Sequence, residues 1–83
     1  MDFCMVEFHD QRSGVSHDLQ LPTTLTGEEL VIALTKAYQL PIDLRDPNQV
    51  YLRSEAPIAL IAGESTLAEL NLSNGTRIYF DVR

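Results

Sequence analysis

Two stretches of alternating apolar and polar residues, joined by a short polar turn, most constrain what this chain can fold into. Residues 3–9 and residues 15–21 both follow this alternation. A period of two is typical of β-strands that bury one face and expose the other. The turn between them contains Gly14, a residue that readily adopts a positive φ. The sequence therefore predicts an N-terminal β-hairpin.

An amphipathic helix is predicted to follow the hairpin. Thr26 and Glu29 have the spacing of a capping box, in which each side chain accepts a hydrogen bond from the backbone N–H of the other. Ile32 falls on the opposite face from the apolar stripe and has no core to enter. The helix is expected to end at Leu40, because Pro41 disfavours the helical conformation in the residue before it. The apolar stripe comprises Leu30, Ala33, Leu34, Ala37 and Tyr38.

Shorter segments complete the predicted order of elements. Strands are predicted at residues 50–53, 58–61 and 78–83. A second capping-box pattern, Thr66 to Glu69, predicts a single helical turn before the last strand. A hairpin, a crossover helix and a final strand predict an α+β fold. We expect a mixed sheet of four or five strands packed on one helix, with the first and last strands adjacent in its middle.

Length and charge limit the classes of function. A chain of 83 residues is expected to form one domain, residues 1–83, with little room for a deep catalytic cleft. Twelve acidic against six basic residues argue against nucleic acid, which needs a clustered basic face. No stretch approaches the roughly 20 apolar residues of a membrane span, so we expect no direct membrane insertion. A single cysteine and the absence of a signal-peptide pattern favour a cytoplasmic location.

Patterns for catalysis or metal binding are weak. His9 and His17 are predicted on different faces of the hairpin, whereas a metal site needs three or four converging ligands. Cys4 lies in an apolar strand pattern, and free cysteines in such positions are usually buried and inert. The glycines are scattered and form no phosphate-binding loop. We therefore expect no enzymatic activity, no metal and no cofactor.

Outward-facing residues of the third and last strands form a candidate protein-binding site. In the predicted topology these two strands are neighbours and the first strand lies beside the last, which brings its outward residues to their border. The candidate binding residues are Met5, Tyr51, Arg53, Arg77 and Tyr79. Tyrosine, arginine and methionine are enriched at interfaces. The alternative is that these side chains form cross-strand pairs that only stabilise the sheet.

Two segments resemble the ubiquitin-like YukD/EsaB family, the small accessory proteins of bacterial type VII secretion. Residues 17–22, His-Asp-Leu-Gln-Leu-Pro, are similar to the start of the family's aromatic-Asp-Leu-x-Val-Pro-x-x-Leu stretch. Residues 66–77 are similar to its Leu-x-Asp-x-x-Ile-x-Asn-Gly-Asp-x-Leu segment. His17 replaces the usual aromatic residue, and Thr76 stands where aspartate is common.

The resemblance implies a ubiquitin-like β-grasp fold and a cytosolic adaptor or regulatory protein that binds a component of a membrane-bound secretion machine. The sequence printed here ends in Asp81-Val82-Arg83 without a Gly-Gly pair, and we therefore expect no conjugation to other proteins. One alternative is a structural homo-oligomer, such as a homodimer, that associates through an exposed apolar face. Another is a degenerate sulfur-carrier-like protein, against which the same ending argues.

Overall fold

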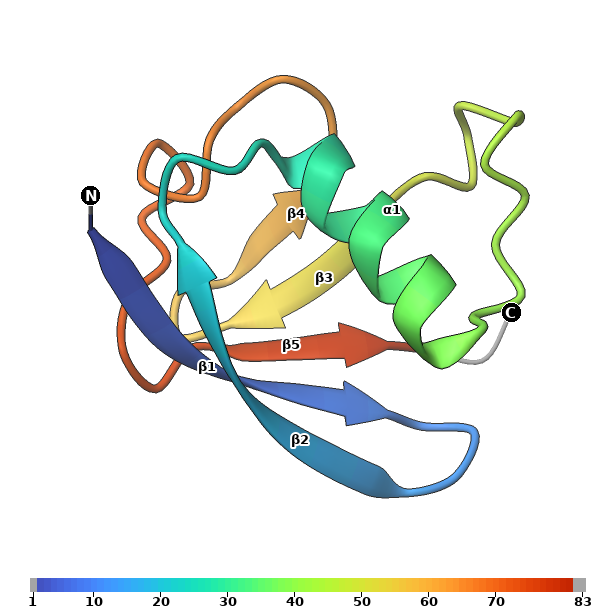
Figure 1. Ribbon diagram of the computed structural model, residues 1–83, viewed down its shortest axis with the longest axis horizontal. Helices are drawn as coiled ribbons and strands as arrows, with labels where there is room; N and C mark the ends of the chain where they lie inside the picture. The colour runs from blue at the N-terminus through green and yellow to red at the C-terminus, as the bar shows by residue number, and fades with distance from the viewer. Residues whose placement is uncertain (1, 82–83) are drawn as a thin grey trace.

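In residues 2–81, five strands form one mixed sheet, and a single helix packs across one of its faces (Figure 1). The computed structural model describes residues 2–81, so the last two residues of the predicted strand 78–83 lie outside the described part of the chain. The elements are β1 (Phe3–Asp10), β2 (Val15–Pro22), α1 (Gly27–Tyr38), β3 (Leu52–Glu55), β4 (Ala59–Ile61) and β5 (Arg77–Phe80).

The strand order is β2-β1-β5-β3-β4. β1 and β5 run parallel, and the other neighbouring pairs are antiparallel. The first and last strands therefore lie side by side near the middle of the sheet, as predicted. The predicted mixed sheet of four or five strands on one helix is confirmed.

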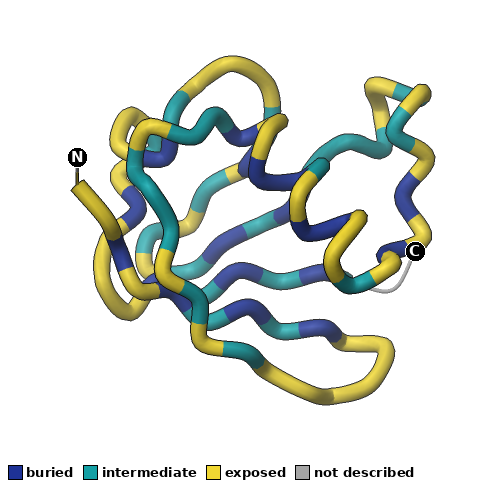
Figure 2. Tube along the Cα trace, in the orientation of Figure 1, coloured by how far each residue is buried: buried dark blue, intermediate teal, exposed yellow. Residues whose placement is uncertain are grey.

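The core lies between α1 and the inward face of the central strands. Buried residues alternate with half-buried or exposed ones along these strands, which is the period-two pattern of the sequence (Figure 2). Burying one large apolar side chain contributes about 1.5–3 kcal/mol, so this layer supplies most of the driving force for folding. The largest fully buried side chains include Phe8, Phe80, Leu30, Leu52, Ile61, Leu67 and Ile78.

The buried side of α1 is rotated relative to the predicted stripe. Leu34 is buried as predicted, but Ala33 and Ala37 are exposed. Val31 and Thr35 are buried in their place. The prediction of Ala33 and Ala37 as core residues is therefore wrong, and the helix leaves one flank uncovered.

Close packing of the opposite flank explains this rotation. The first turn of α1 lies against the segment after β4, where a Cβ on Gly27 would come within 2.6 Å of the backbone nitrogen of Ala62. The backbone N–H of Glu28 donates to the carbonyl of Gly63 at 2.9 Å. Glycine allows this close approach, which draws α1 toward β4 and away from β2.

Both predicted capping boxes are present. Thr26 Oγ1 accepts from the N–H of Glu29 at 3.1 Å, and Glu29 Oε1 accepts from the N–H of Thr26 at 2.9 Å. Thr66 and Glu69 make the same reciprocal pair. The second box opens a hydrogen-bonded turn rather than an α-helix, and this turn is bridged to the first box through Thr26 and Thr66.

Two element boundaries differ from the predictions for local reasons. α1 ends at Tyr38 rather than Leu40, because Gln39 adopts the left-handed conformation with φ 53° and caps the helix. β3 covers Leu52–Glu55 rather than residues 50–53. The extended strand buries a serine hydroxyl, that of Ser54, which donates to the carbonyl of Pro57 at 2.8 Å.

Candidate protein-binding surface

The strand register brings charged and aromatic residues together on the face of the sheet that α1 does not cover. Across β3 and β5, Arg53 lies opposite Tyr79, and across β5 and β1, Tyr79 lies opposite His9. Their neighbours in sequence point into the core. We call this group the outer-face cluster; it comprises Glu7, His9, Arg53, Glu55, Arg77, Tyr79 and Asp81.

Tyr79 is the centre of the outer-face cluster. The guanidinium carbon of Arg53 lies 4.2 Å from the centroid of its ring, a distance suited to a cation–π contact. The ring of His9 stacks from the neighbouring strand, with centroids 4.9 Å apart and an interplanar angle of 23°. Tyr79 is therefore held between two side chains from two different strands.

Ion pairs fix the arginines of the outer-face cluster. Arg53 donates to both carboxylate oxygens of Asp81 and, through Nη1, to Glu55 at 3.1 Å. Glu55 also accepts from the hydroxyl of Tyr79 at 3.3 Å and from Arg77 at 3.5 Å. Glu55 thus joins Arg53, Arg77 and Tyr79 into one network across β3 and β5.

The network stabilises the charged forms of Glu55 and Arg53. Partial desolvation acts to raise the pKa of Glu55, but hydrogen bonds from Arg53 and Tyr79 outweigh it and hold this pKa below its usual value. The hydrogen bond to Asp81 raises the pKa of Arg53. The side chains are all partly exposed, and ion pairs in such positions add little stability. The clearer effect of these ion pairs is on geometry. They hold the arginine and glutamate side chains in one arrangement before any partner binds.

The structure brings together three of the five candidate binding residues. Arg53, Arg77 and Tyr79 belong to the outer-face cluster. Tyr51 is half-buried and lies immediately before β3. Met5 is 48% exposed and lies beside the turn before β5, so that His9 rather than Met5 is the β1 residue next to Tyr79.

Residues that the sequence reasoning missed also contribute to this surface. His9, Glu55 and Asp81 lie within the cluster, and only the strand register reveals their contacts. Leu60 of β4 lies opposite Arg53 and is 61% exposed, and Ile58, just before β4, is 90% exposed. Residues 58–61 are all apolar, and this carried a signal for the apolar margin, because a strand points alternate side chains to opposite faces and some of them must therefore face outward.

Among residues 2–81, the positions of Cys4 and His17 do not favour chemistry that needs a nucleophile beside a base. Cys4 is buried, and desolvation raises the pKa of its thiol. Cys4 and His17 point to the same side of the hairpin, but their cross-strand pairs are four positions apart, roughly 13 Å along the strand. Within residues 2–81, no group of three or more His, Cys, Asp or Glu side chains is placed to hold a metal ion.

Solved structures with this architecture come from ubiquitin-like proteins. The C-terminal ubiquitin-like domain of mouse tubulin-specific chaperone e matches with a TM-score of 0.68 and 12% identity, covering 99% of this chain and 90% of that one. The fold is the ubiquitin-like β-grasp. The UBL domain of Plasmodium falciparum Dsk2 matches with a TM-score of 0.60 and 12% identity, covering 94% and 97%. Ubiquitin of Caldiarchaeum subterraneum matches with 0.60 and 13%, covering 99% and 98%.

Sequence comparison adds no family to this result. No protein-family model matches the sequence, and no curated protein matches it. At 12–13% identity the structural likeness establishes the fold alone. No helix in the described part of the chain, residues 2–81, has the length and apolar character needed to cross a bilayer.

Proposed function

We propose that this protein is a ubiquitin-like adaptor that binds a protein partner through the outer-face cluster. The observation that carries the proposal is the fixed position of Tyr79 between Arg53 and His9. Tyrosine and arginine dominate binding hot spots because they combine large contact area with directional hydrogen bonds. A surface held in place before binding loses less side-chain entropy when the partner docks.

The partner that we propose is a component of a type VII secretion system. The support is the resemblance of residues 17–22 and 66–77 to the YukD/EsaB family, together with the β-grasp fold expected of that family. The two segments lie close together in space, because the backbone N–H of Ala68 donates to Thr23 at 3.1 Å, just after β2. The role is one of binding rather than catalysis, in keeping with the buried thiol of Cys4.

Capture of the secretion component from lysate tests the proposal. Tyr79→Ser should weaken capture by at least about 2 kcal/mol, roughly 30-fold, if this tyrosine is a hot spot. Asp43→Asn is the matched surface control, since Asp43 is exposed in the loop after α1. Thermal melts should show that both variants stay folded. Unchanged capture by a folded Tyr79→Ser variant would overturn the assignment of this surface.

A second candidate is a structural homo-oligomer. The exposed side chains of Ile58 and Leu60 favour it, because they place apolar area beside Arg53 on the same face. Light scattering separates the two functions: an adaptor should be a monomer at micromolar concentration. A dimer that Leu60→Asp converts to monomer would support the oligomer instead.

A further inference from the structure

β2 presents an open edge to solvent. It lies at one end of the strand order and pairs only with β1, and no other strand of residues 2–81 lies against it. The N–H of Thr23 donates to Asp2, which fixes the alternation of hydrogen bonds along the hairpin. By that alternation the N–H groups of Ser16, Asp18 and Gln20 point away from β1. Such an edge can accept a strand from another chain.

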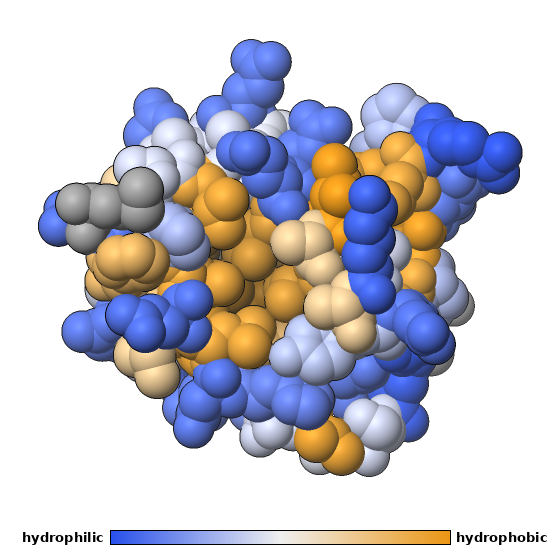
Figure 3. All heavy atoms as spheres, viewed as in Figure 1, coloured by the Kyte–Doolittle hydropathy of each residue, from blue (hydrophilic) through white to orange (hydrophobic). Residues whose placement is uncertain are grey.

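An apolar groove runs beside this edge. On β2, Leu19 and Leu21 are half-buried and pack against the core without being covered. On α1, Ala33 and Ala37 are exposed on the flank opposite Glu28, which places them toward β2. Figure 3 shows a hollow of apolar surface to one side of the helix. The rotation of α1 toward β4 is what leaves this groove open.

Aromatic contacts close one end of the groove. Tyr38, in the last turn of α1, packs against His17 of β2 with ring centroids 4.6 Å apart. The same ring lies 5.2 Å from that of Phe8. The open length of the groove therefore begins beyond His17 and runs toward Pro22, alongside Leu19 and Leu21.

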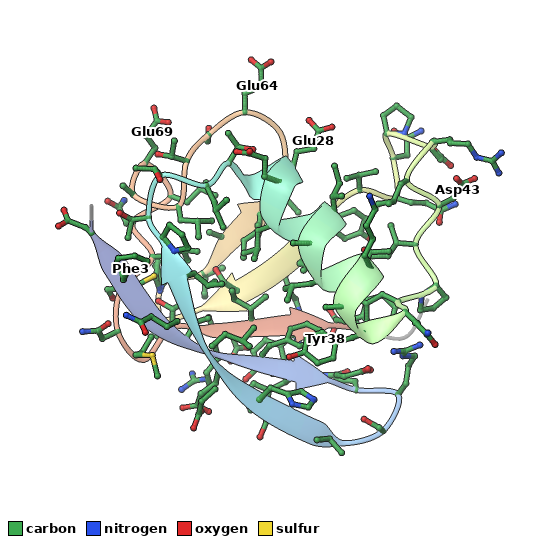
Figure 4. The ribbon with its side chains drawn as sticks, viewed as in Figure 1. Phe3, Glu28, Tyr38, Asp43, Glu64 and Glu69 are labelled. Carbon is green, nitrogen blue, oxygen red and sulfur yellow. The ribbon has the colours of Figure 1, made fainter. Side chains whose placement is uncertain are left out.

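The other end of the groove is acidic. The turn from Thr66 to Glu69 lies beside the end of β2, because Ala68 N–H donates to Thr23. Residues 13–35 and 54–76 contain no lysine or arginine. Figure 4 shows the carboxylates of Glu64 and Glu69 projecting at this end of the molecule. Glu29 lies here too, because its side chain accepts from the N–H of Thr26, which is bridged to Thr66. Lys36, by contrast, lies in the last turn of α1.

We propose that this groove binds an extended segment of another protein, which adds to β2 as a sixth strand. Alternate apolar side chains of that segment would pack on Leu19, Leu21 and Ala33. Lysine or arginine residues would lie near Pro22, where Glu29 and Glu69 provide opposite charge. An identical copy fits this site less well, because it carries the same net charge of −6. The site is separate from the outer-face cluster, since the sheet lies between them.

A short synthetic peptide of alternating valine and threonine with three lysines at one end is the direct probe. It is prepared in two forms, with the lysines first or last, because the added strand could run parallel or antiparallel to β2. Amide hydrogen exchange by NMR should slow at Ser16, Asp18 and Gln20 when one form binds. The amides of Leu19 and Leu21 already face β1 and serve as internal references. Replacing the lysines by glutamates should weaken binding at least roughly tenfold.

Protein variants test the contributions of charge and of packing to peptide binding separately. Glu29→Gln combined with Glu69→Gln removes two charges but keeps both capping boxes, since glutamine can replace glutamate in this motif. This double variant should bind the lysine peptide with roughly fivefold lower affinity. Asp43→Asn with Asp46→Asn removes the same charge from the loop after α1 and should change nothing. Ala33→Arg, which fills the groove with a like charge, should abolish binding.

Several outcomes decide the proposal. Tyr79→Ser should leave peptide binding unchanged, so failure of the outer-face proposal would not affect this one. Unchanged exchange at Ser16, Asp18 and Gln20 under millimolar peptide would overturn it. So would slow exchange at these amides without peptide that disappears on dilution, because a second copy would then occupy the edge. Equal affinity for the lysine and glutamate peptides would also overturn it, since the acidic end would play no part.

Discussion

Leu34 is buried at the middle of α1 and is 4% exposed. Leu34→Ala should lower the free energy of unfolding by about 2–5 kcal/mol, because it removes apolar burial and leaves a cavity. Ala33→Ser, one residue away on the exposed flank, should cost only about 0.5 kcal/mol through helix propensity. Urea melts of the two variants against the parent chain measure both values. A loss below about 1 kcal/mol for Leu34→Ala would contradict the core assignment.

In α1, the apolar stripe of the sequence predicted some buried residues correctly and others incorrectly. The spacing of Leu30, Leu34 and Tyr38 located the buried side of α1 within one residue. The spacing could not show which flank of the helix is buried beside these residues, because alanine fits either a core or a surface. Contact of Gly27 with the segment after β4 settled the rotation, and that contact joins residues 35 positions apart in sequence. Ile32, expected to face solvent, is half-buried as a result of the same rotation.

At the scale of elements, Arg12 ties the first hairpin to the end of α1. Its guanidinium donates to the carbonyls of Tyr38 and Gln39, both at 3.1 Å. It also pairs with Asp10 at 2.7 Å, and Asp10 is only 7% exposed. The hydrogen bond from Arg12 lowers the pKa of Asp10 below its usual value. One side chain thus satisfies two helix-terminal carbonyls and a buried carboxylate.

This contact predicts how stability depends on pH. A carboxylate whose folded pKa is lowered contributes stability above its unfolded pKa, about 3.9, and loses that contribution as the pH falls through the lower folded pKa. Asp10→Asn should therefore be less stable than the parent at pH 6, and the difference should shrink between about pH 4 and pH 2. Urea melts across this range measure it. Arg12→Gln should show the same convergence, and a constant difference for both variants would exclude the linkage.

The elements themselves were largely readable from sequence, and their long-range contacts were not. Period-two alternation gave the hairpin, and threonine–glutamate spacing gave both capping boxes, because each pattern is local. The start of β3 was misplaced by two residues, since Val50 and Leu52 fit a strand equally well. The reach of Arg12 to Tyr38 depends on how the hairpin folds over the helix, which no local pattern records.

At the scale of the whole molecule, the candidate surface was half predictable. Alternation together with strand order placed Arg53, Arg77 and Tyr79 on one face. The stacking of His9 on Tyr79 depends on the parallel register of β1 and β5, and residues far apart in sequence give no local signal for that register. The open groove likewise follows from how α1 lies between β2 and β4, a property of the assembled layers.

Two separate surfaces on one small domain predict independent binding. The outer-face cluster and the β2 groove lie on opposite sides of the sheet and share no residue, so their free energies should add. A saturating amount of the lysine peptide should change the affinity for a captured secretion component by less than about threefold. Tyr79→Ser should weaken only the binding of the captured protein, and Ala33→Arg should weaken only the binding of the peptide. Titration calorimetry with each ligand, alone and in the presence of the other, measures these values. Mutual displacement would show that both ligands use one surface, and the domain would then be a simple binder rather than an adaptor that joins two partners.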